Sequence, residues 1–208
     1  MERFMEKYNV SRETFLKLKT YEASLHEWQN KFNLVSNASL ENAWQRHFED
    51  SVQLFKFIPT SARTMLDFGS GAGFPALVLA IIAQEKLPQL KVKLIESIKK
   101  KTLYLNTVKE LCKLNVDVVN DRIENLPAQK VDVITSRAMC NLNDLLKYSL
   151  KFTTKQTLMI FPKGRSYQEE LDEARRNWKF DCRIEKNEVS DDGVILLINH
   201  LSSIKGVK

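Results

Sequence analysis

Three glycines at alternate positions form the stretch with the clearest potential for chemistry. Gly69, Gly71 and Gly73 follow a short apolar run, Thr64–Phe68, and precede an apolar helical pattern that begins at Pro75. Glycine has no side chain that would keep a ligand from the backbone, and it tolerates positive φ angles. A short apolar run that stops at glycine is typical of a buried parallel strand. We therefore predict a strand-to-helix turn against which a flat or anionic cofactor could lie.

The spacing of this turn distinguishes between cofactor classes. In the dinucleotide fingerprint the third glycine stands three positions after the second, and here Phe74 occupies that position. A nicotinamide oxidoreductase is therefore disfavoured. Asp67 precedes the glycines, and this arrangement fits the S-adenosylmethionine turn of class I methyltransferases better. The alternative is a turn without a ligand, whose glycines only let the helix pack on the strand.

A second acidic residue follows the next expected strand. Lys91–Ile95 has the pattern of a parallel strand, and Glu96 stands at its carboxyl end, 27 residues after Gly69. Ligands of open α/β sheets bind beyond the carboxyl ends of the strands, where an acid can accept hydrogen bonds from both hydroxyls of a ribose. We predict this role for Glu96; the alternative is a surface glutamate.

Two more strands bring polar residues to the same edge. Val116–Val119 precedes the polar turn Asp121–Glu124, in which Ile123 could cover one face of an adenine. The next strand, Val131–Ile134, is followed by Arg137. An arginine at this edge is expected to bind an anion or to orient a site.

Basic residues elsewhere are candidates for contact with a polyanion. The net charge is +6, from 32 Lys and Arg against 26 Asp and Glu, which permits a nucleic-acid partner without requiring one. The lysine run 99–101 has the alternative of a solvated helix face. Arg46 and His47 lie where a predicted helix could face a cleft, although His47 could equally pack against a neighbouring helix. Lys163 and Arg165 form a later cluster.

Helices and strands alternate along the chain, which predicts an α/β fold with a mostly parallel sheet. Apolar residues at helical spacing predict two N-terminal helices, over 11–32 and 44–58. We expect residues 1–60 to form a helical extension packed on the sheet, and 61–208 to form the α/β domain as one structural unit. Further helices are expected over 98–114, from Asn143 and over 167–178, and further strands over 157–161, 182–189 and 194–201, the last two as an antiparallel pair. The expected buried set of the helix over 98–114 is Leu103, Leu105, Val108, Leu111 and Leu114.

Composition excludes several classes of protein. A chain of 208 residues with 43% hydrophobic residues can form one sizeable core, but not comfortably two domains. No apolar stretch is long enough to span a membrane, and the charged N-terminus does not resemble a signal peptide, so we expect a cytoplasmic protein without membrane association. Cys112, Cys140 and Cys182 are far apart, so we expect reduced thiols and no metal site.

In combination these residues resemble one family, the ribosomal RNA small subunit methyltransferase G family. The resemblance covers about residues 30–200. It is carried by Asn33-Leu34, Arg46-His47, Asp50-Ser51, Asp67–Pro75, Glu96-Ser97, Asp121–Glu124, Ser136–Ala138 and Lys163-Gly164. The resemblance implies a seven-stranded, Rossmann-like class I methyltransferase with S-adenosylmethionine as methyl donor. The implied acceptor is N7 of a guanine in the decoding-region loop of 16S ribosomal RNA, in the 30S subunit or its precursor.

The resemblance also implies roles for residues. Cofactor contacts are implied for Gly69, Phe74, Glu96, Ser97, Ile98, Ile123, Glu124 and Arg137, and we add Gly71 and Gly73 from the turn itself. Arg137 is the residue expected to act in catalysis, and Arg46, His47, Lys163 and Arg165 are the candidates for contact with RNA. The family often has Asp at the position of Glu96, and Ala-Leu at the positions of Phe161-Pro162. The first departure keeps the carboxylate, whereas the second changes the loop before Lys163.

The chemistry of guanine N7 agrees with what the sequence lacks. N7 carries a free lone pair, so an enzyme needs mainly to align donor and acceptor. No Asn-Pro-Pro-Tyr motif for exocyclic amines follows the fourth strand, and no Pro-Cys pair offers a nucleophile for a pyrimidine. Two alternatives stay open: a methyltransferase of a small molecule or a protein, and a ribosome-assembly protein without turnover. We expect a monomer.

Overall fold

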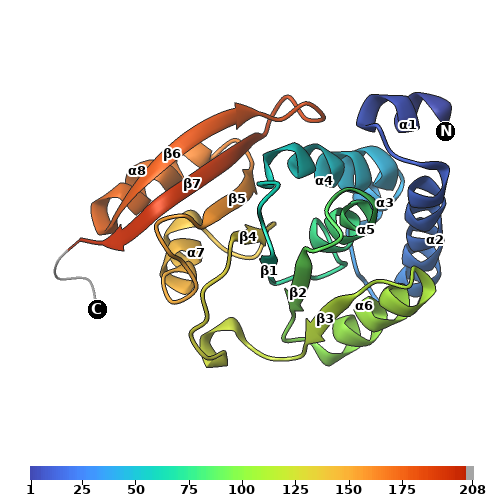
Figure 1. The fold of residues 1–208 in the computed structure, drawn as a ribbon, viewed down its shortest axis with the longest axis horizontal. Coiled ribbons are helices and arrows are strands. Elements are labelled where there is room, and N and C mark those ends of the chain that lie inside the picture. Colours follow the sequence, from blue (N-terminus) through green and yellow to red (C-terminus); the bar gives the residue numbers. More distant parts are fainter. Residues whose placement is uncertain (205–208) are drawn as a thin grey trace.

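Seven strands form one sheet in the computed structural model, which describes residues 1–204. They lie in the order β3-β2-β1-β4-β5-β7-β6 (Figure 1). Strands β1 to β5 pair in parallel, and β7 runs antiparallel to both β5 and β6. The bounds are β1 Thr64–Phe68, β2 Lys91–Ile95, β3 Val116–Val119, β4 Val133–Ser136, β5 Leu158–Lys163, β6 Trp178–Lys186 and β7 Val194–Ser203. The expected mostly parallel sheet with a C-terminal antiparallel pair is confirmed.

Helices cover both faces of the sheet, because alternate residues of a strand point to opposite sides. Met65 of β1 belongs to the hydrophobic cluster shared with α2, α5 and α6, whereas Leu66 belongs to the cluster shared with α7 and α8 (Figure 1). The bounds are α2 Arg12–Gln29, α5 Ala76–Lys86, α6 Lys99–Leu111, α7 Leu142–Ser149 and α8 Tyr167–Asn177. All residues from 76 to 83 of α5 are buried, since α2 packs on its outer side.

The second N-terminal helix is not continuous, contrary to the prediction. It is divided into η1, a π-helical segment, α4, and η2, a 3₁₀ segment, with the bounds Trp44–Glu49, Asp50–Val52 and Gln53–Phe57. In an α-helix the Asp50 amide would donate to the Arg46 carbonyl, but here it is directed at the Gln45 carbonyl, five residues earlier. The Arg46 carbonyl instead accepts a hydrogen bond from Arg137 (3.2 Å).

The buried face of α6 also differs from the expected one. Leu105 and Val108 are buried as expected, but Leu103 and Leu111 are 53% and 54% exposed. The stripe that meets the core runs through Tyr104, Leu105, Val108 and Cys112, which recur at helical spacing. Leu103 and Leu111 lie on a different side of the helix.

Several strand boundaries differ from the predicted ones. The strand expected over 182–189 is β6, Trp178–Lys186, because Lys186, opposite Val194, is its last residue paired with β7, and residues 187–193 form the loop between the two strands. Strand β4 begins at Val133 rather than Val131, because the Val131 amide donates to the Phe152 carbonyl (3.1 Å) outside the sheet. Strand β5 continues through Pro162 to Lys163, where it pairs with β7. Three short helices complete the chain: α1 Glu2–Tyr8, α3 Asn37–Leu40 and η3 Ile123–Asn125.

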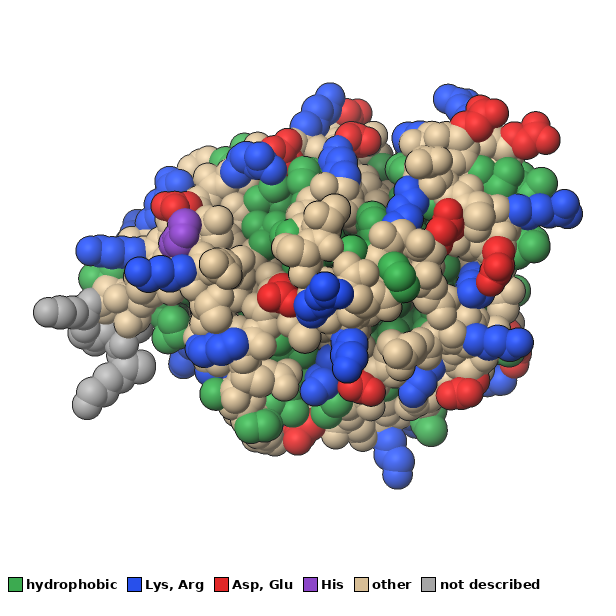
Figure 2. Space-filling model, in the orientation of Figure 1, with side chains coloured by type: hydrophobic (Ala, Val, Ile, Leu, Met, Phe, Trp, Pro, Cys, Tyr) green, Lys and Arg blue, Asp and Glu red, His purple; other side chains and the backbone are tan. Residues whose placement is uncertain are grey.

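The surface carries charges of both signs. Figure 2 shows lysine and arginine side chains spread over the visible face, with acidic side chains among them rather than one separate basic patch. Across residues 1–204, none of the helices combines the length and the apolar character that crossing a bilayer would require.

Candidate active site

The glycine turn joins β1 to α5 with a positive φ at each of its three glycines. The φ angle is 63° at Gly69, 55° at Gly71 and 94° at Gly73, in the left-handed region that favours glycine. The Ser70 amide donates to the Ile95 carbonyl at the end of β2 (3.0 Å), which holds the turn over the carboxyl edge of the sheet. The expected strand-to-helix turn is therefore present.

Glu96 lies directly against this turn. Its Oε2 accepts a hydrogen bond from the Gly71 amide (2.9 Å), and its Oε1 accepts one from the Ile98 amide (2.7 Å). The side chain of Asn120, after β3, donates to the carbonyls of Glu96 and Ser97, both at 3.0 Å. These contacts hold a buried carboxylate, 5% exposed, beside the backbone of the turn.

Asp67 is buried at the end of β1 with one oxygen unpaired. Its Oδ1 accepts a hydrogen bond from Thr135 Oγ1 (2.6 Å), but Oδ2 has no partner in the described part of the chain. Burial raises the pKa of Asp67 to about 7. A buried acceptor without a donor is rare in folded proteins, and this one indicates a place for a donor from a ligand.

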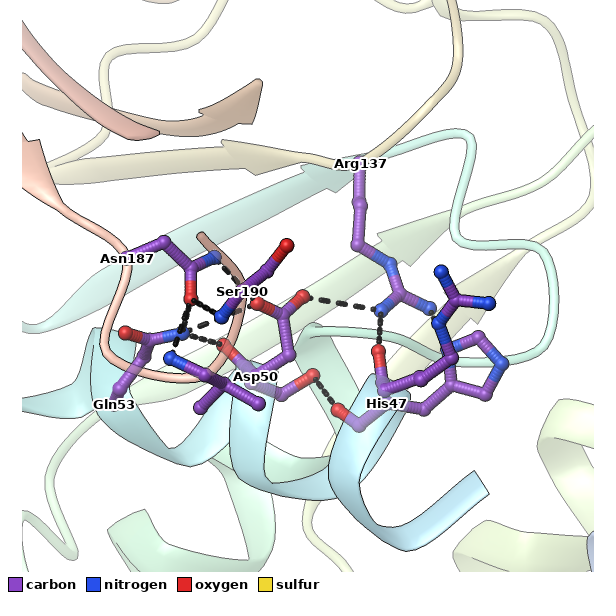
Figure 3. A network of polar contacts seen from close by, with 9 residues as sticks. His47, Asp50, Gln53, Arg137, Asn187 and Ser190 are labelled. Carbon is purple, nitrogen blue, oxygen red and sulfur yellow. Dashed lines mark hydrogen bonds and ion pairs between the residues drawn. The ribbon is translucent and has the colours of Figure 1, made fainter. Parts of the chain in front are cut away.

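Arg137 follows β4, and its guanidinium packs on Phe74, the residue after the third glycine of the turn. The guanidinium carbon lies 5.0 Å from the centre of the Phe74 ring. Nη2 lies 2.9 Å from His47 Nδ1, while Nη1 donates to the Arg46 carbonyl and lies 3.4 Å from Asp50 Oδ2 (Figure 3). The arginine therefore connects the end of β4 with the N-terminal helices and with the turn.

His47 is held as a neutral ring. It stacks on Phe74, with ring centres 4.9 Å apart and planes 24° apart. Burial, and then the charge of Arg137, lower the pKa of His47 to about 3. Because Arg137 donates to Nδ1, the ring proton is assigned to Nε2, which has no partner among residues 1–204. The residue is 8% exposed, so little of it is available to a partner molecule.

A cleft of about 870 Å³ opens beside Arg137, beyond the carboxyl ends of β4 and β5. One wall is formed by Arg46 and Asp50 of the N-terminal segment, and another by the loop 187–193 between β6 and β7. Met139 also lines the cleft, and its side chain lies against Gly69. The cleft and the glycine turn are therefore neighbours.

The cations expected to contact RNA differ in their exposure and in whether they already form ion pairs. Lys163 is 9% exposed and donates to Glu170 Oε2 (2.8 Å) and to the Cys140 carbonyl (3.1 Å). Arg165 is 80% exposed and forms an ion pair with Asp192 of the loop 187–193 (2.6 Å). Arg46 is exposed, and its guanidinium has no ion pair in the described structure. Of these three, Arg46 is the most available.

All site residues expected from the sequence except His47, which is buried against Phe74 and does not line the cleft, fall into two groups. The first lies at the carboxyl ends of β1, β2 and β3 and contains Gly69, Gly71, Gly73, Phe74, Glu96, Ser97, Ile98, Ile123 and Glu124. The second lines the cleft and contains Arg46, Arg137, Lys163 and Arg165. Arg137 joins the two groups, because it also packs on Phe74. Phe74 itself is 3% exposed, and its ring packs against the rings of Tyr21, His47 and Phe48.

Comparison with known proteins assigns the chain to a family. The family model of the rRNA small subunit methyltransferase G matches residues 15–193. The chain belongs to this family. A relative from Orientia tsutsugamushi (strain Ikeda) is 42% identical over 191 residues, which are 92% of this chain and 93% of the relative. One from Ruegeria sp. (strain TM1040) is 36% identical over 200 residues, 96% of this chain and 94% of the relative. Both are named ribosomal RNA small subunit methyltransferase G.

A solved structure shares the fold of this chain. The O-methyltransferase from Bacillus cereus, in complex with SAH, superposes with a TM-score of 0.58 over 87% of this chain and 90% of that chain. The identity is 17%, so the likeness concerns the fold alone. The expected class I methyltransferase fold is confirmed.

The residues at the edge of the sheet fit the S-adenosylmethionine expected for this family. A carboxylate has about four acceptor sites, and backbone amides use two of those on Glu96, so the others could accept the ribose hydroxyls. The unpaired Oδ2 of Asp67 could accept from the α-ammonium group of the methionine part. An ammonium group would also favour the ionised form of this carboxyl, whose pKa is about 7.

The cleft also depends on residues that sequence patterns did not single out. Gln53 and Asn187 are buried polar residues that connect the N-terminal segment with the loop 187–193 (Figure 3). They are 134 positions apart, and no motif links them. Glu170, the partner of Lys163, lies on the helix expected over 167–178, in which the sequence indicated no site residue.

Proposed function

We propose that this chain transfers a methyl group from S-adenosylmethionine to N7 of a guanine in 16S ribosomal RNA. Its relatives are named as methyltransferases of the small-subunit ribosomal RNA. The observation that carries the proposal is the contact between Arg137 and Phe74. It joins the cleft, whose lining holds four cations and the acids Asp50, Glu170 and Asp192, to the residue that follows the three glycines of the cofactor turn, so that donor and acceptor sites adjoin.

The cofactor site in this proposal is the edge formed by β1, β2 and β3. Glu96 binds the ribose, Ile123 covers the adenine, and Asp67 accepts from the ammonium group. The remaining contacts come from Gly69, Gly71, Gly73, Phe74, Ser97, Ile98, Glu124 and Arg137. When bound, S-adenosylmethionine supplies an electrophilic methyl group on a sulfonium sulfur.

The reaction at N7 demands alignment rather than proton transfer. The N7 lone pair is free at neutral pH, so no residue has to remove a proton before the transfer. His47, with a pKa of about 3, stays neutral under these conditions and is not required as an acid. Arg137 is assigned to positioning, because its fixed guanidinium borders both the turn and the cleft. An arginine commonly recognises a guanine edge through O6, which lies beside N7.

The acceptor has to be an exposed guanine. In A-form RNA the deep major groove hides N7 from side chains, whereas bases in loops can be presented to a protein. Arg46 and Arg165 at the cleft are assigned to the RNA backbone around such a base, with Lys163 deeper in the wall. The partner is the 30S subunit or its precursor.

The test is to map N7-methylguanine in 16S RNA from cells with and without this protein. The purified enzyme is then added, with labelled S-adenosylmethionine, to 30S subunits from the deficient cells. One methylated guanine is expected in the cells that contain the protein, restored by the wild-type enzyme and not by Arg137→Ala. Methylation of metabolites or proteins instead of RNA would contradict the proposal. Binding of 30S subunits without binding of the cofactor in calorimetry would favour an assembly factor.

A further inference from the structure

A buried amide connects the far wall of the cleft to Arg137. Asn187, the first residue of the loop 187–193, is 5% exposed. Its Nδ2 donates to Asp50 Oδ1 at 2.7 Å, and the other oxygen of Asp50 lies 3.4 Å from Arg137 Nη1 (Figure 3). Two contacts therefore lead from the loop to the guanidinium.

The same amide also fixes the loop. Asn187 Oδ1 accepts hydrogen bonds from Gln53 Nε2 (2.9 Å) and from the amides of Val189 (2.8 Å) and Ser190 (2.9 Å). Gln53 Nε2 lies 3.1 Å from Asp50 Oδ1 as well, and Gln53 Oε1 accepts from the Glu188 amide (2.8 Å). The two oxygens of Asp50 are thus divided between amide donors on one side and the arginine on the other.

We propose that Asn187 is a positioning residue that acts on Arg137 through Asp50. A carboxylate beside a single guanidinium can rotate, and the amide donors on Oδ1 remove this freedom, so that Oδ2 stays directed at Nη1. The inference rests on the proposed function, because it assigns a purpose to the fixed orientation of Arg137. The opposing interpretation is that the network only stabilises the loop.

The substitution Asn187→Asp separates these two interpretations. An aspartate keeps the oxygen that binds the loop amides but replaces the donor to Asp50 with a second carboxylate. Two carboxylates at this distance repel each other when both are ionised, and one of them takes up a proton as the pH falls. The protonated carboxyl can again donate to Asp50. A role through Asp50 therefore predicts a defect at high pH that diminishes at lower pH, whereas a role in the loop alone predicts no such pH dependence.

Other charged groups near this pair must be considered in the pH profile. They lie on the elements around it and are Arg46, His47 and Glu49 of η1, Lys56 of η2, Arg137 after β4, Lys186 at the end of β6, and Glu188, Asp191 and Asp192 of the loop. Glu49, Glu188 and Asp192 have ion pairs with Lys7, Lys56 and Arg165. All these groups are shared by the wild type and the variant, so the ratio of the two profiles isolates position 187.

The experiment measures methylation of 30S subunits by the full-length protein at pH 6 and pH 8. We expect Asn187→Asp to lower kcat about tenfold at pH 8, because small displacements of positioning groups have effects of this size or larger. At pH 6 the defect is expected to shrink to about threefold or less, since the dyad then holds a proton. The KM for S-adenosylmethionine should change little at either pH, because Asn187 lies on the cleft side of Arg137.

Gln168→Glu is the matched control. Gln168 is exposed on α8, and its Nε2 donates to Asp172 Oδ1 (3.1 Å), so the same amide-to-acid change meets an aspartate away from the cleft. Its kcat should equal that of the wild type at both pH values. Thermal unfolding of each variant shows whether it is folded under the assay conditions.

A second measurement needs neither RNA nor cofactor. The ¹⁵N resonance of His47 Nδ1 reports the hydrogen bond from Arg137, and with 3 histidines in the chain it can be assigned by substitution. In Asn187→Asp at pH 8, this resonance should shift toward the value of a ring nitrogen without a hydrogen bond. At pH 6 it should lie close to the wild-type value again. The inference would be overturned if Asn187→Asp had the same kcat as the wild type at pH 8, or the same loss of kcat at pH 6 and pH 8. It would also be overturned if the His47 resonance were the same in the variant and the wild type. If the wild type fails to methylate 30S subunits, only the proposed function fails, and the His47 resonance still tests the link.

Discussion

The Glu96 carboxylate and the Gly71 amide, 2.9 Å apart, connect the ends of two strands that lie side by side in the sheet. The second oxygen of the carboxylate accepts from the Ile98 amide (2.7 Å). The acid at the end of β2 is therefore fixed by backbone donors on both sides, in an orientation set by the glycine turn. A ribose would meet a carboxylate that is already ordered, which lowers the entropy lost on binding.

The first prediction concerns this carboxylate. In Glu96→Gln, an NH₂ group that cannot accept replaces one of the two oxygens, so one of the two backbone amides loses its acceptor and fewer acceptor sites are left for the ribose hydroxyls. Hydrogen bonds to charged groups contribute about 1.5–3 kcal/mol, which corresponds to about a 10- to 100-fold increase in the Kd for S-adenosylmethionine. Isothermal calorimetry measures it. Glu96→Asp is the control, since it keeps a carboxylate and should bind more tightly than Glu96→Gln; unchanged binding in both variants would remove Glu96 from the cofactor site.

The second prediction concerns the shape of the cation at position 137. Arg137→Lys keeps the charge, but an ammonium on a flexible stem cannot reach His47, Asp50 and the Arg46 carbonyl at once. We expect kcat on 30S subunits to fall about 100-fold, because alignment is lost although the charge is kept. Single-turnover methylation assays measure it. If Arg137→Lys is fully active, charge alone is sufficient and the fixed geometry has no role in the transfer.

The third prediction is a pH dependence of stability from Asp67. Its pKa in the folded protein is about 7, above the ordinary value of 3.8. Between these values the unfolded chain loses the proton while the folded chain keeps it, so this group lowers stability as the pH rises toward 7 and adds no further change above it. Asp67→Asn removes this loss. In the absence of cofactor, the free energy of unfolding of the variant, relative to the wild type, should therefore rise from pH 5 to pH 8.

Urea unfolding at both pH values measures this difference. One pKa unit corresponds to about 1.4 kcal/mol, so the relative gain should be of the order of a few kcal/mol. Asp192→Asn is a control, because Asp192 is exposed and its pKa is lowered by Arg165 rather than raised by burial. A difference for Asp67→Asn that is constant with pH would mean that Asp67 is ionised in the folded protein.

The fourth prediction compares two glycines of the turn. A Cβ at Gly73 would lie 2.6 Å from Tyr21 Oη and would also collide with Leu77, and both side chains are fully buried. A Cβ at Gly71 would meet nothing closer than 3.7 Å. Both positions have positive φ, which costs about 1–2 kcal/mol for a residue with a Cβ. The free energy of unfolding should fall by about 1–3 kcal/mol more in Gly73→Ala than in Gly71→Ala, because the added methyl group overpacks the core.

Thermal and urea unfolding of the two variants measure this contrast. Gly164→Ala is the control, since a Cβ at Gly164 meets nothing within 4 Å and its φ is not positive. It should stay within about 0.5 kcal/mol of the wild type. If Gly71→Ala and Gly73→Ala lost the same free energy of unfolding, the contacts with Tyr21 and Leu77 would not be what excludes a side chain at position 73.

The sequence predicted those parts of the site that are encoded locally. The glycine turn and the acid after β2 lie within short segments whose patterns specify both the strand and the residues at its carboxyl end. The mostly parallel sheet could also be predicted, because strands that alternate with helices along the chain are typical of one. The boundary at Pro162 was missed, since proline usually ends a strand, whereas here β5 continues through it to pair with β7.

The features that the sequence could not predict depend on tertiary contacts. Asn187 meets Asp50 across 137 positions, and it fell within the strand expected over 182–189, where no pattern suggested a buried link to the N-terminal segment. The break at η1 could not be seen in the apolar stripe, because a π-helical turn keeps apolar residues on one side while it changes which carbonyl is free. The orientation of α6 was missed because leucines occur on two of its sides, and only packing against α2 and β3 decides between them.

The fifth prediction concerns the most available cation of the cleft. Arg46 is exposed beside the opening, and its guanidinium makes no ion pair within residues 1–204. If it contacts an RNA phosphate, Arg46→Ala should weaken binding to 16S RNA and reduce the slope of log K against log salt by about 0.7–0.9, the value for one phosphate contact. Filter binding at several salt concentrations measures the slope. Lys91→Ala is the matched control, because Lys91 is exposed at the amino end of β2, on the opposite edge of the sheet, and its slope should equal that of the wild type. If Arg46→Ala and Lys91→Ala lowered the slope equally, net charge alone would attract the RNA. The cleft would then not be the surface that binds the RNA.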